Sequence, residues 1–428
     1  MAAELKEKRT PGAVVAIVSH DGVVYARAFG LANVETNAPM QQEMLFRIGS
    51  TTKMFTAAAM VKLSEAGKIR LNEPIGNRVK GLSAGLSQLT PHYLLGNSAG
   101  VSDFAPPFIS QDDESLGKMV RGWKDDVLFA GQGEIYSYSS PGFWLSGFVV
   151  EEVEGKPYAD AMDSLLFKPL GMNRTTLRPL VAMTYPMAGG HSVSAEGPPA
   201  IVRPFYNNVA QWPAGSIFSN IKDLSRFVIA FLNEGRLDGQ QVFSPALIAQ
   251  MSSPHIAVPG EKDSYYAYGL TTFKYRGVQF VAHGGFSRGY GSMIQMAPAR
   301  KFAVIVLTNK SGEILRRTLN KATELGLGLT AEEPESVRPA APAALTPTEM
   351  AEFIGTYTGT TRWEVYLKDG KLFVKNEGTD YHLTSSGNRK FSFGSANENE
   401  LVFVPGKSGK IEFVFSELYS AKKVKPIG

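Results

Sequence analysis

The sequence predicts an α+β fold followed by a small, separate all-β unit. Apolar, strand-like runs stand near both ends of the first 328 residues, and helical patterns lie between them. A stretch rich in proline, alanine and glutamate, residues 329–347, then interrupts these patterns. After it, apolar and polar residues alternate toward the C-terminus. The simplest arrangement is an antiparallel sheet fed from both chain ends with helices packed on it, joined by a linker to a β-sandwich or barrel.

The larger unit is expected to begin with a hairpin and to contain two clear helices in its first half. Residues 13–30 hold two apolar runs around the turn sequence SHDG, which predicts a β-hairpin. Apolar residues recur at helical spacing over residues 51–66, and Gly67 is suited to end that helix. A second helix is predicted over residues 141–155, with proline in its first turn and glycine past its end.

The remainder of the larger unit is expected to hold one more helix, several strands and a final helix. The helix begins at about Lys222. Residues 265–308 contain apolar segments separated by short turns, which predicts consecutive antiparallel strands, and a helix over about residues 314–325 follows. The expected domain, linker and second domain are residues 1–328, 329–347 and 348–428.

The composition excludes several classes of function. The chain has 428 residues, with 44 basic and 40 acidic side chains, a net charge of +4 and no long Lys/Arg run, so no nucleic-acid partner is expected. It has no cysteine, which excludes disulfides, thiolate catalysis and Cys-ligated metals. The six histidines show no zinc-ligand spacing, so no metal or other cofactor is expected. No apolar run reaches the length of a membrane span, about 18 residues.

Ser50 and Lys53 form the first candidate catalytic pair. Residues three apart lie on one face of a helix, so the Ser50 hydroxyl would lie near the Lys53 amine at a helix N-terminus. A sufficiently desolvated lysine acts as a base and makes such an alcohol nucleophilic. Among the four S-x-x-K patterns, only this one follows a strand-like LFRIG and opens a long apolar helix; the alternative for Ser50 is an ordinary N-cap. The other three begin at Ser115, Ser219 and Ser420.

The competing motif is G-x-S-x-G, the nucleophile elbow of α/β-hydrolases, which needs a buried strand before the serine and a helix after it. It occurs around Ser83, Ser98 and Ser287. Ser83 has no strand before it, Ser98 follows a more helical segment, and Ser287 lies between two predicted strands. The chain also lacks the alternating β–α pattern of that fold. These serines are therefore expected to lie in glycine-rich turns.

Two further elements could complete a site. Tyr138 precedes the predicted helix at Pro141, where its hydroxyl could face a cleft, and a nearby lysine ammonium would lower its pKa and let it shuttle protons. The alternative is a packing aromatic. His283 is expected at the end of a strand, followed by Gly284 and Gly285, whose bare backbone would let a substrate approach and pair with N–H groups. The alternative there is a structural histidine.

Taken in order, FRIGSTTKMFTAAAM, YSYSSPGFWLSG and HGGFSRGYGS resemble the three motifs of the penicillin-recognising serine hydrolases. The resemblance runs from about Pro11 to Asn309 and includes class C β-lactamases, family VIII carboxylesterases, D-stereospecific aminopeptidases and DD-peptidases. It implies a β-lactamase/transpeptidase-like fold with a helical subdomain and an acyl-enzyme on Ser50. It also implies that Lys53 and Tyr138 handle protons, and that the backbone N–H groups of Ser50 and Phe286 form the oxyanion hole.

The third motif and the end of the second motif depart from the pattern of that family. His283, Gly284 and Gly285 match the substrate-binding third motif but have His-Gly in place of Lys-Thr, and Ser140 replaces the asparagine of the second motif. β-Lactamases use those groups to hold the lactam amide and carboxylate. Small esters, amides or peptides are therefore the expected substrates, with weak or absent β-lactamase activity. Arg288 could supply the missing positive charge.

The resemblance extends past the linker and suggests a compartment. Residues after 346 resemble the lipocalin-like domain attached to many such hydrolases. Family members are often exported, so a periplasmic or secreted location is expected, although the charged N-terminus of this sequence has no signal peptide. Three other functions stay open: a non-catalytic binding or scaffolding protein, a true β-lactamase or DD-peptidase, and an α/β-hydrolase.

Overall fold

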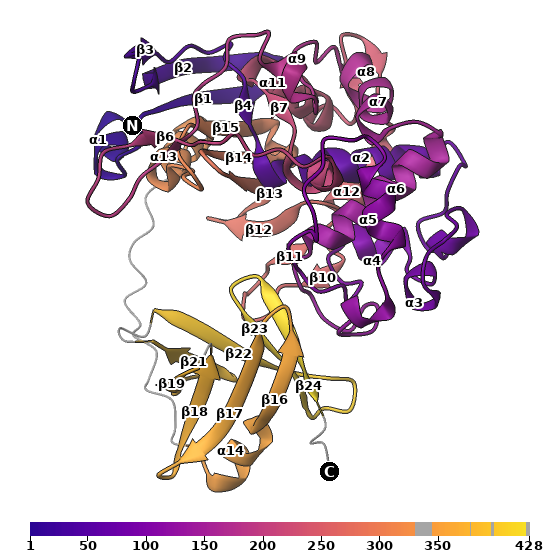
Figure 1. The fold of residues 1–428 in the computed structure, drawn as a ribbon. Coiled ribbons are helices and arrows are strands. Elements are labelled where there is room, and N and C mark those ends of the chain that lie inside the picture. Colours follow the sequence, from indigo (N-terminus) through magenta and orange to yellow (C-terminus); the bar gives the residue numbers. More distant parts are fainter. Residues whose placement is uncertain (330–344, 377, 395–397, 425–428) are drawn as a thin grey trace.

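The structure is a computed structural model that describes residues 1–329, 345–376, 378–394 and 398–424. Figure 1 shows an α+β part, formed by the first 329 residues, and a smaller β part, formed by the residues from 345 onward. The predicted α+β fold class with a following all-β unit is confirmed. Most of the predicted linker, residues 330–344, lies outside the described residues. The boundaries of the two domains stay a prediction.

The large sheet has nine antiparallel strands in the order β10-β11-β12-β13-β14-β15-β1-β2-β3. β1 pairs with β2, its hairpin partner, and with β15, the last strand of the α+β part. Strands from the beginning and from the end of the α+β part therefore belong to one sheet, as predicted. The strands are β1 (Gly12–Ser19), β2 (Gly22–Asn33), β3 (Ala38–Pro39), β10 (Ile256–Ala257), β11 (Tyr265–Tyr266), β12 (Thr271–Tyr275), β13 (Val278–Ser287), β14 (Tyr290–Ala297) and β15 (Phe302–Thr308).

Both faces of this sheet are covered, which explains why β1 is apolar without alternation. Successive side chains of a strand point to opposite faces. Val14 belongs to the main hydrophobic core, whereas Val15 packs in a second cluster with Leu5 and Leu319. Leu5 lies on α1 (Ala2–Glu7) and Leu319 on α13 (Arg316–Leu327), so these two helices close the second face.

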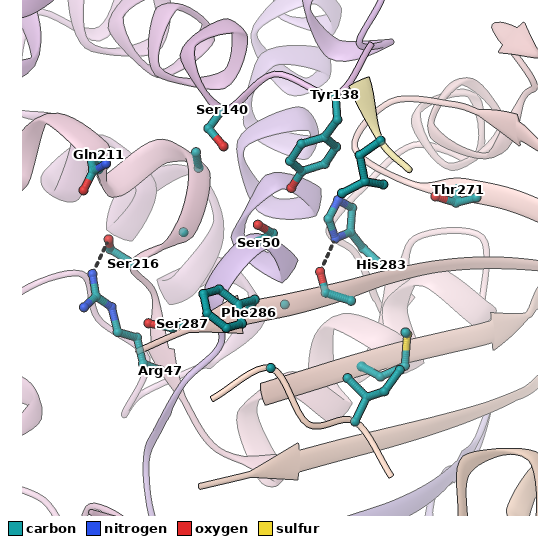
Figure 2. Close-up of a pocket in the computed structure, with 18 of the residues that line it drawn as sticks. Arg47, Ser50, Tyr138, Ser140, Gln211, Ser216, Thr271, His283, Phe286 and Ser287 are labelled. Atoms are coloured by element: carbon teal, nitrogen blue, oxygen red, sulfur yellow. Dashed lines mark hydrogen bonds between the residues drawn. The ribbon is translucent and has the colours of Figure 1, made fainter. Parts of the chain in front are cut away.

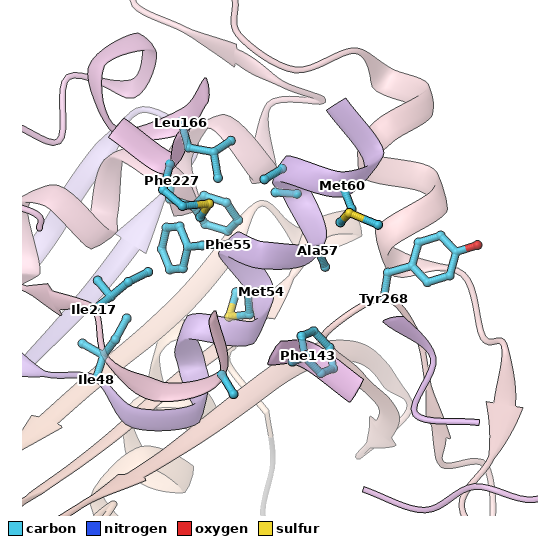
Figure 3. Close-up of a cluster of buried hydrophobic side chains, with 14 of the residues drawn as sticks. Ile48, Met54, Phe55, Ala57, Met60, Phe143, Leu166, Ile217, Phe227 and Tyr268 are labelled. Carbon is cyan, nitrogen blue, oxygen red and sulfur yellow. The ribbon is translucent and has the colours of Figure 1, made fainter. Parts of the chain in front are cut away.

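The main core is built around helix α2 (Thr52–Glu65), most of whose residues are buried. A helix that is buried all round belongs inside a domain rather than on its surface. Figure 3 shows Phe55 of α2 beside Phe227, and Phe143 on another side of the same helix. The longer helices that contribute to the same core are α5 (Ser115–Arg121), α6 (Ser140–Glu154), α11 (Ile221–Leu232) and α12 (Pro245–Ser252). Short helices in this core are α3 (Ala84–Ser87), α4 (Pro91–Leu95), α7 (Tyr158–Met162), α8 (Lys168–Leu170) and α10 (Trp212–Gly215), whereas α9 (Pro179–Ala182) packs in a separate small cluster.

Helices α2, α6 and α11 confirm three predicted helices, whereas three other predictions need correction. The final helix begins two residues later than predicted because Leu315 adopts a left-handed conformation, with φ of 50°. The first predicted strand after residue 265 is split into β11 and β12 by a turn at Gly269, whose φ is +65°. Strand β13 does not end at His283 but continues to Ser287, because its pairing with β14 persists to Tyr290.

The smaller part is a barrel-like antiparallel sheet of nine strands in the order β19-β18-β17-β16-β24-β23-β22-β21-β20. Its core contains aromatic side chains such as Phe353, Tyr357 and Trp363. Phe353 comes from the preceding helix α14 (Pro347–Phe353), which begins inside the predicted linker. The strands are β16 (Gly355–Gly359), β17 (Arg362–Lys368), β18 (Lys371–Asn376), β19 (Thr379–His382), β20 (Thr384–Gly387), β21 (Lys390–Phe393), β22 (Asn399–Pro405), β23 (Ile411–Ser416) and β24 (Tyr419–Val424).

The two parts meet in an apolar cluster that contains the predicted catalytic tyrosine. Tyr136, Tyr138 and Tyr266 of the α+β part pack there with Val402 and Phe415 of the β part. The β part therefore contacts the same segment that the second sequence motif occupies. Among the described residues, no helix is both long enough and apolar enough to cross a lipid bilayer.

Candidate active site

Ser50 lies in a short 3-10 turn, η1 (Gly49–Thr51), that leads directly into α2. Gly49 has φ of +52°, and a Cβ atom there would lie 2.4 Å from the Phe286 carbonyl oxygen. Only glycine therefore allows this turn to approach β13 so closely. The backbone of Ser50 and that of Phe286, which are the expected oxyanion-hole groups, consequently belong to adjoining segments.

Gly285 has a different role from the one expected of it. A Cβ atom at this position would lie 1.9 Å from the Ile48 carbonyl oxygen, so its missing side chain makes room for the protein's own backbone. Close contact with the segment before Ser50 is thus the physical reason for glycine at this position. Gly284 is less constrained, since a Cβ there would meet the flexible end of Met293 at 3.0 Å. Both glycines line the pocket described below.

Lys53 is completely buried and its amine faces Ser50. Its Nζ lies 3.3 Å from Ser50 Oγ, 3.5 Å from Ser140 Oγ and 3.0 Å from the Ala214 carbonyl oxygen. Burial lowers the pKa of Lys53 to about 7, an effect that the charge of Asp103 partly offsets. A large fraction of this lysine is therefore neutral near neutral pH, as its expected role as a base requires.

Tyr138 lies against both members of this pair. The Lys53 Nζ is 4.6 Å from the centroid of the tyrosine ring, and the Tyr138 hydroxyl is hydrogen-bonded to the side chain of Ser50. Figure 2 shows that hydroxyl pointing toward Ser50. Burial raises the pKa of Tyr138 well above its ordinary value, so the expectation that a nearby ammonium would lower it is wrong. Tyr138 holds its proton, and Lys53 is the better base of the two.

Ser140 is the first residue of α6 and is held by a residue that sequence reasoning missed. Its backbone N–H donates to Asp103 Oδ1 at 2.7 Å. The helix is also capped by Ser139, whose hydroxyl accepts from the Gly142 N–H. Burial raises the pKa of Asp103. In the sequence, Asp103 is one acidic residue in a loop without periodicity or motif, and no local signal distinguishes it.

His283 is fixed inside the structure rather than free to hold a charged group. Its Nδ1 is 2.6 Å from the Gly284 carbonyl oxygen, which only accepts, so Nδ1 carries the hydrogen and donates. Nε2 lies 3.1 Å from the Tyr266 hydroxyl and accepts from it. Burial, reinforced by Lys53, lowers the pKa of His283 to about 3. The imidazole is therefore neutral at physiological pH and cannot replace a lysine ammonium.

Ser50, Tyr138, Ser140 and His283 line one pocket of about 720 Å³ (Figure 2). Phe286 stands at its mouth with a largely exposed side chain, and Leu418 and Tyr419 of the β part form another portion of the lining. Two arginines also line it. The buried Arg47 donates to the Tyr206 carbonyl oxygen at 2.6 Å, and Arg288 lies over the ring of the same tyrosine. Among the described residues that line the pocket, none is an aspartate or glutamate.

The competing serines have structural surroundings. Ser83 donates to the Asp125 carboxylate at the protein surface, and Ser98 is buried in the loop after α4. Neither lines the pocket. Ser287 does, at the end of β13 and without a helix after it. The three remaining S-x-x-K serines, Ser115, Ser219 and Ser420, each hydrogen-bond to other groups of the protein.

Comparison with known proteins agrees with this geometry. The sequence profile of the Beta-lactamase family matches residues 1–327. Penicillin-binding protein 4 of Amycolatopsis lactamdurans is 25% identical over 370 residues, which cover 82% of this chain and 94% of that protein. Unguisins hydrolase ungD' of Aspergillus campestris is 29% identical over 318 residues, which cover 70% of this chain and 58% of that hydrolase.

Two solved structures share the fold over both parts of the chain. The octameric penicillin-binding protein homologue from Pyrococcus abyssi has a TM-score of 0.68 and 24% identity, and the match covers 99% of this chain and 98% of that one. SurE has a TM-score of 0.78 and 22% identity, with 99% and 97% covered. Since the family profile spans nearly all of the α+β part and the relatives include penicillin-binding proteins and a hydrolase, the chain belongs to the Beta-lactamase family of serine hydrolases.

Proposed function

We propose that the protein hydrolyses ester and small amide bonds through an acyl-enzyme on Ser50. The observation that carries this proposal is the buried Lys53 amine, 3.3 Å from the Ser50 hydroxyl, with its pKa lowered to about 7. A general base works best when its pKa lies near the working pH. A binding or scaffolding protein would gain nothing from a buried amine beside a hydroxyl, because removing an amine from water costs free energy.

Acylation follows from these positions. Ser50 Oγ attacks the substrate carbonyl carbon while its proton passes to Lys53 Nζ. The carbonyl oxygen becomes an oxyanion and accepts hydrogen bonds from the Ser50 and Phe286 backbone N–H groups. The tetrahedral intermediate then expels the alcohol or amine. Tyr138 gives its hydroxyl proton to that leaving group and regains one from the Lys53 ammonium, so Lys53 ends the step neutral.

Deacylation repeats the same proton path with water. Lys53 takes a proton, directly or by relay through the Tyr138 hydroxyl, from a water molecule that attacks the acyl carbon, and the bond from that carbon to Ser50 Oγ breaks. The proton returns to Ser50 Oγ and the carboxylic acid leaves.

The substitutions at Ser140 and His283 favour esters and small amides over β-lactams. An asparagine side chain offers two N–H donors, whereas the Ser140 hydroxyl offers one, and it already lies 3.5 Å from Lys53 Nζ. The neutral His283 ring uses both nitrogens within the protein. Neither group supports the hold on a lactam amide and carboxylate that a β-lactamase needs. The small-molecule substrate would enter past the exposed side chain of Phe286.

The experiment that tests this proposal compares two pocket serines on the same ester, p-nitrophenyl butyrate. Ser50→Ala should reduce kcat/KM by several orders of magnitude, because the catalytic residues act as a unit. The matched control is Ser287→Ala, which removes the pocket serine of a G-x-S-x-G motif and should retain most activity. A fluorophosphonate probe should label Ser50, as read by peptide mass. Labelling at Ser287, or an active Ser50→Ala variant, would reject the proposal.

A further inference from the structure

The chain at the start of β24, residues 418–420, runs alongside residues 136–138, the segment that contains Tyr138. Tyr138 N–H donates to the Leu418 carbonyl oxygen at 2.9 Å, and Ser420 Oγ donates to the Tyr136 carbonyl oxygen at 2.6 Å. The Ser420 N–H donates to Ser137 Oγ at 3.0 Å. The β part therefore provides hydrogen-bond partners for three consecutive residues of the second sequence motif.

The β part also holds Asp103 from two sides. The Asp103 N–H donates to Thr360 Oγ1 at 2.7 Å, in the turn between β16 and β17. The Tyr419 hydroxyl donates to Asp103 Oδ2 at 3.2 Å. The other carboxylate oxygen, Oδ1, accepts from the Ser140 N–H at 2.7 Å. Asp103 thus lies between the β part and the N-terminal end of α6.

Asp103 is linked to the catalytic amine by charge. Burial lowers the pKa of Lys53, and the carboxylate of Asp103 counteracts that effect. In return, the charge of Lys53 favours ionised Asp103, as do the hydrogen bonds from Ser140 and Tyr419. The side chains that face Lys53 from the surrounding elements are those of Ser50, Asp103, Tyr138, Ser140, Phe143 and His283. The backbone carbonyl of Ala214 also faces it. Of these side chains, only that of Asp103 is a carboxyl group.

We propose that Tyr419 of the β part is a positioning residue, which acts through Asp103 on the placement and charge of Lys53. This inference rests on the proposed function of the Ser50 site. The β part is then a component of the catalytic unit, and not only a wall of the pocket. Tyr419 needs no contact with the reacting atoms for this role, because its hydroxyl orients the Asp103 carboxylate, and the charge of that carboxylate acts on the Lys53 amine.

Removing the Tyr419 hydroxyl has two consequences. A buried carboxylate that loses one of its donors is less readily ionised, and its support for the Lys53 ammonium weakens. The pKa of Lys53 then falls, so the neutral amine persists to lower pH and the acid limb of kcat/KM moves to lower pH. Asp103 also loses its fixed orientation toward Ser140, so the plateau of kcat falls by about tenfold, the loss typical of one hydrogen bond to a charged group.

The test uses the full chain and compares pH profiles of p-nitrophenyl butyrate hydrolysis. Asp103→Asn should shift the acid limb down by about one pH unit, the lower end of what a neighbouring opposite charge exerts. Tyr419→Phe should shift it in the same direction by less, and the double variant should shift it no further than Asp103→Asn. The matched control is Lys422→Met. Lys422 lies on β24, as Tyr419 does, and forms an ion pair with Glu134, but it neither contacts Asp103 nor lines the pocket.

The outcomes separate this inference from the proposed function. An unshifted limb in Tyr419→Phe, or an equal shift in Lys422→Met, would overturn the positioning role while Ser50 labelling stands. Failure of the fluorophosphonate to label Ser50 would overturn both. If Tyr419→Phe does not fold, Thr360→Val removes the hydrogen bond that the Asp103 backbone N–H donates to the β part and should lower kcat through the placement of Asp103; an unchanged kcat would overturn the positioning role.

Discussion

Replacing Lys53 by methionine should abolish activity and, at neutral pH, make the folded protein more stable. Methionine is an unbranched apolar side chain that fills a lysine-shaped space without a charge. Lys53 is completely buried, and its pKa falls from the ordinary 10.5 to about 7 in the folded protein. A lysine that binds its proton less tightly when folded than when unfolded lowers the free energy of unfolding.

The sign and size of this effect depend on pH. Below about pH 7, Lys53 is charged in both the folded and the unfolded state, and the full penalty applies. As the pH rises toward 10.5, the unfolded chain also loses its proton and the penalty disappears. At about 1.4 kcal/mol for each unit of pKa shift, the penalty is on the order of 5 kcal/mol near about pH 6.5 and falls to between about 1 and 2 kcal/mol near about pH 9.5.

Urea unfolding at these two pH values measures the difference. The stability gained by Lys53→Met should be larger by about 3 kcal/mol at the lower pH, whatever constant amount the lost hydrogen bonds to Ser50 and Ala214 subtract. Lys62→Met on the same helix is the matched control, because Lys62 is only partly buried and should show a much smaller pH dependence. An equal stability difference at both pH values would refute the assignment of a neutral Lys53, and with it the base of the mechanism.

Two further predictions concern the third motif and the substrate. Gly285→Ala should destabilise the protein by at least about 2 kcal/mol and abolish ester hydrolysis, because the added methyl group collides with the Ile48 carbonyl. The control, Gly284→Ala, should cost less than about 1 kcal/mol. Thermal unfolding of both variants measures the difference, and equal melting temperatures would contradict the argument that β13 needs glycine at 285 to approach Ile48. Measured on one enzyme preparation, kcat/KM for p-nitrophenyl butyrate should exceed kcat/KM for nitrocefin by more than about tenfold, because one missing charge-assisted hydrogen bond to the lactam lowers the rate by about tenfold. A D-alanyl amide should also be a better substrate than nitrocefin. Nitrocefin turnover above both others would show that the roles of Ser140 and His283 are misassigned.

Sequence patterns within one element were sufficient where the physics is local. The i, i+3 spacing of Ser50 and Lys53 places both side chains on one face of a helix, and the structure has them 3.3 Å apart. The apolar periodicity of residues 51–66 predicted the helix that the structure contains as α2, although the burial of most of its residues was not predicted. Strand runs at both chain ends predicted one sheet, because exposed strand edges are satisfied by pairing with one another.

Protonation states lay beyond the sequence because they depend on burial. The pattern suggested that an ammonium would lower the pKa of Tyr138, yet the hydroxyl is enclosed by Tyr136, Tyr266 and the β part, and desolvation dominates. The same cause lowers the pKa values of His283 and Lys53. Desolvation is set by atoms from many segments, and no window of the sequence contains them.

The composition of the site was likewise decided by tertiary structure wherever partners are far apart in the chain. The sequence alone determined the fold class, the contribution of both chain ends to one sheet and the candidate pair at the start of α2, since each follows from periodicity within a few residues. Asp103 and Tyr419 are 316 residues apart and share no motif, and they meet only because β24 packs beside the tyrosine segment. Gly285 is required by the Ile48 carbonyl of another segment. Such contacts arise from how the two sheets and α2 pack in space, which local side-chain patterns do not encode.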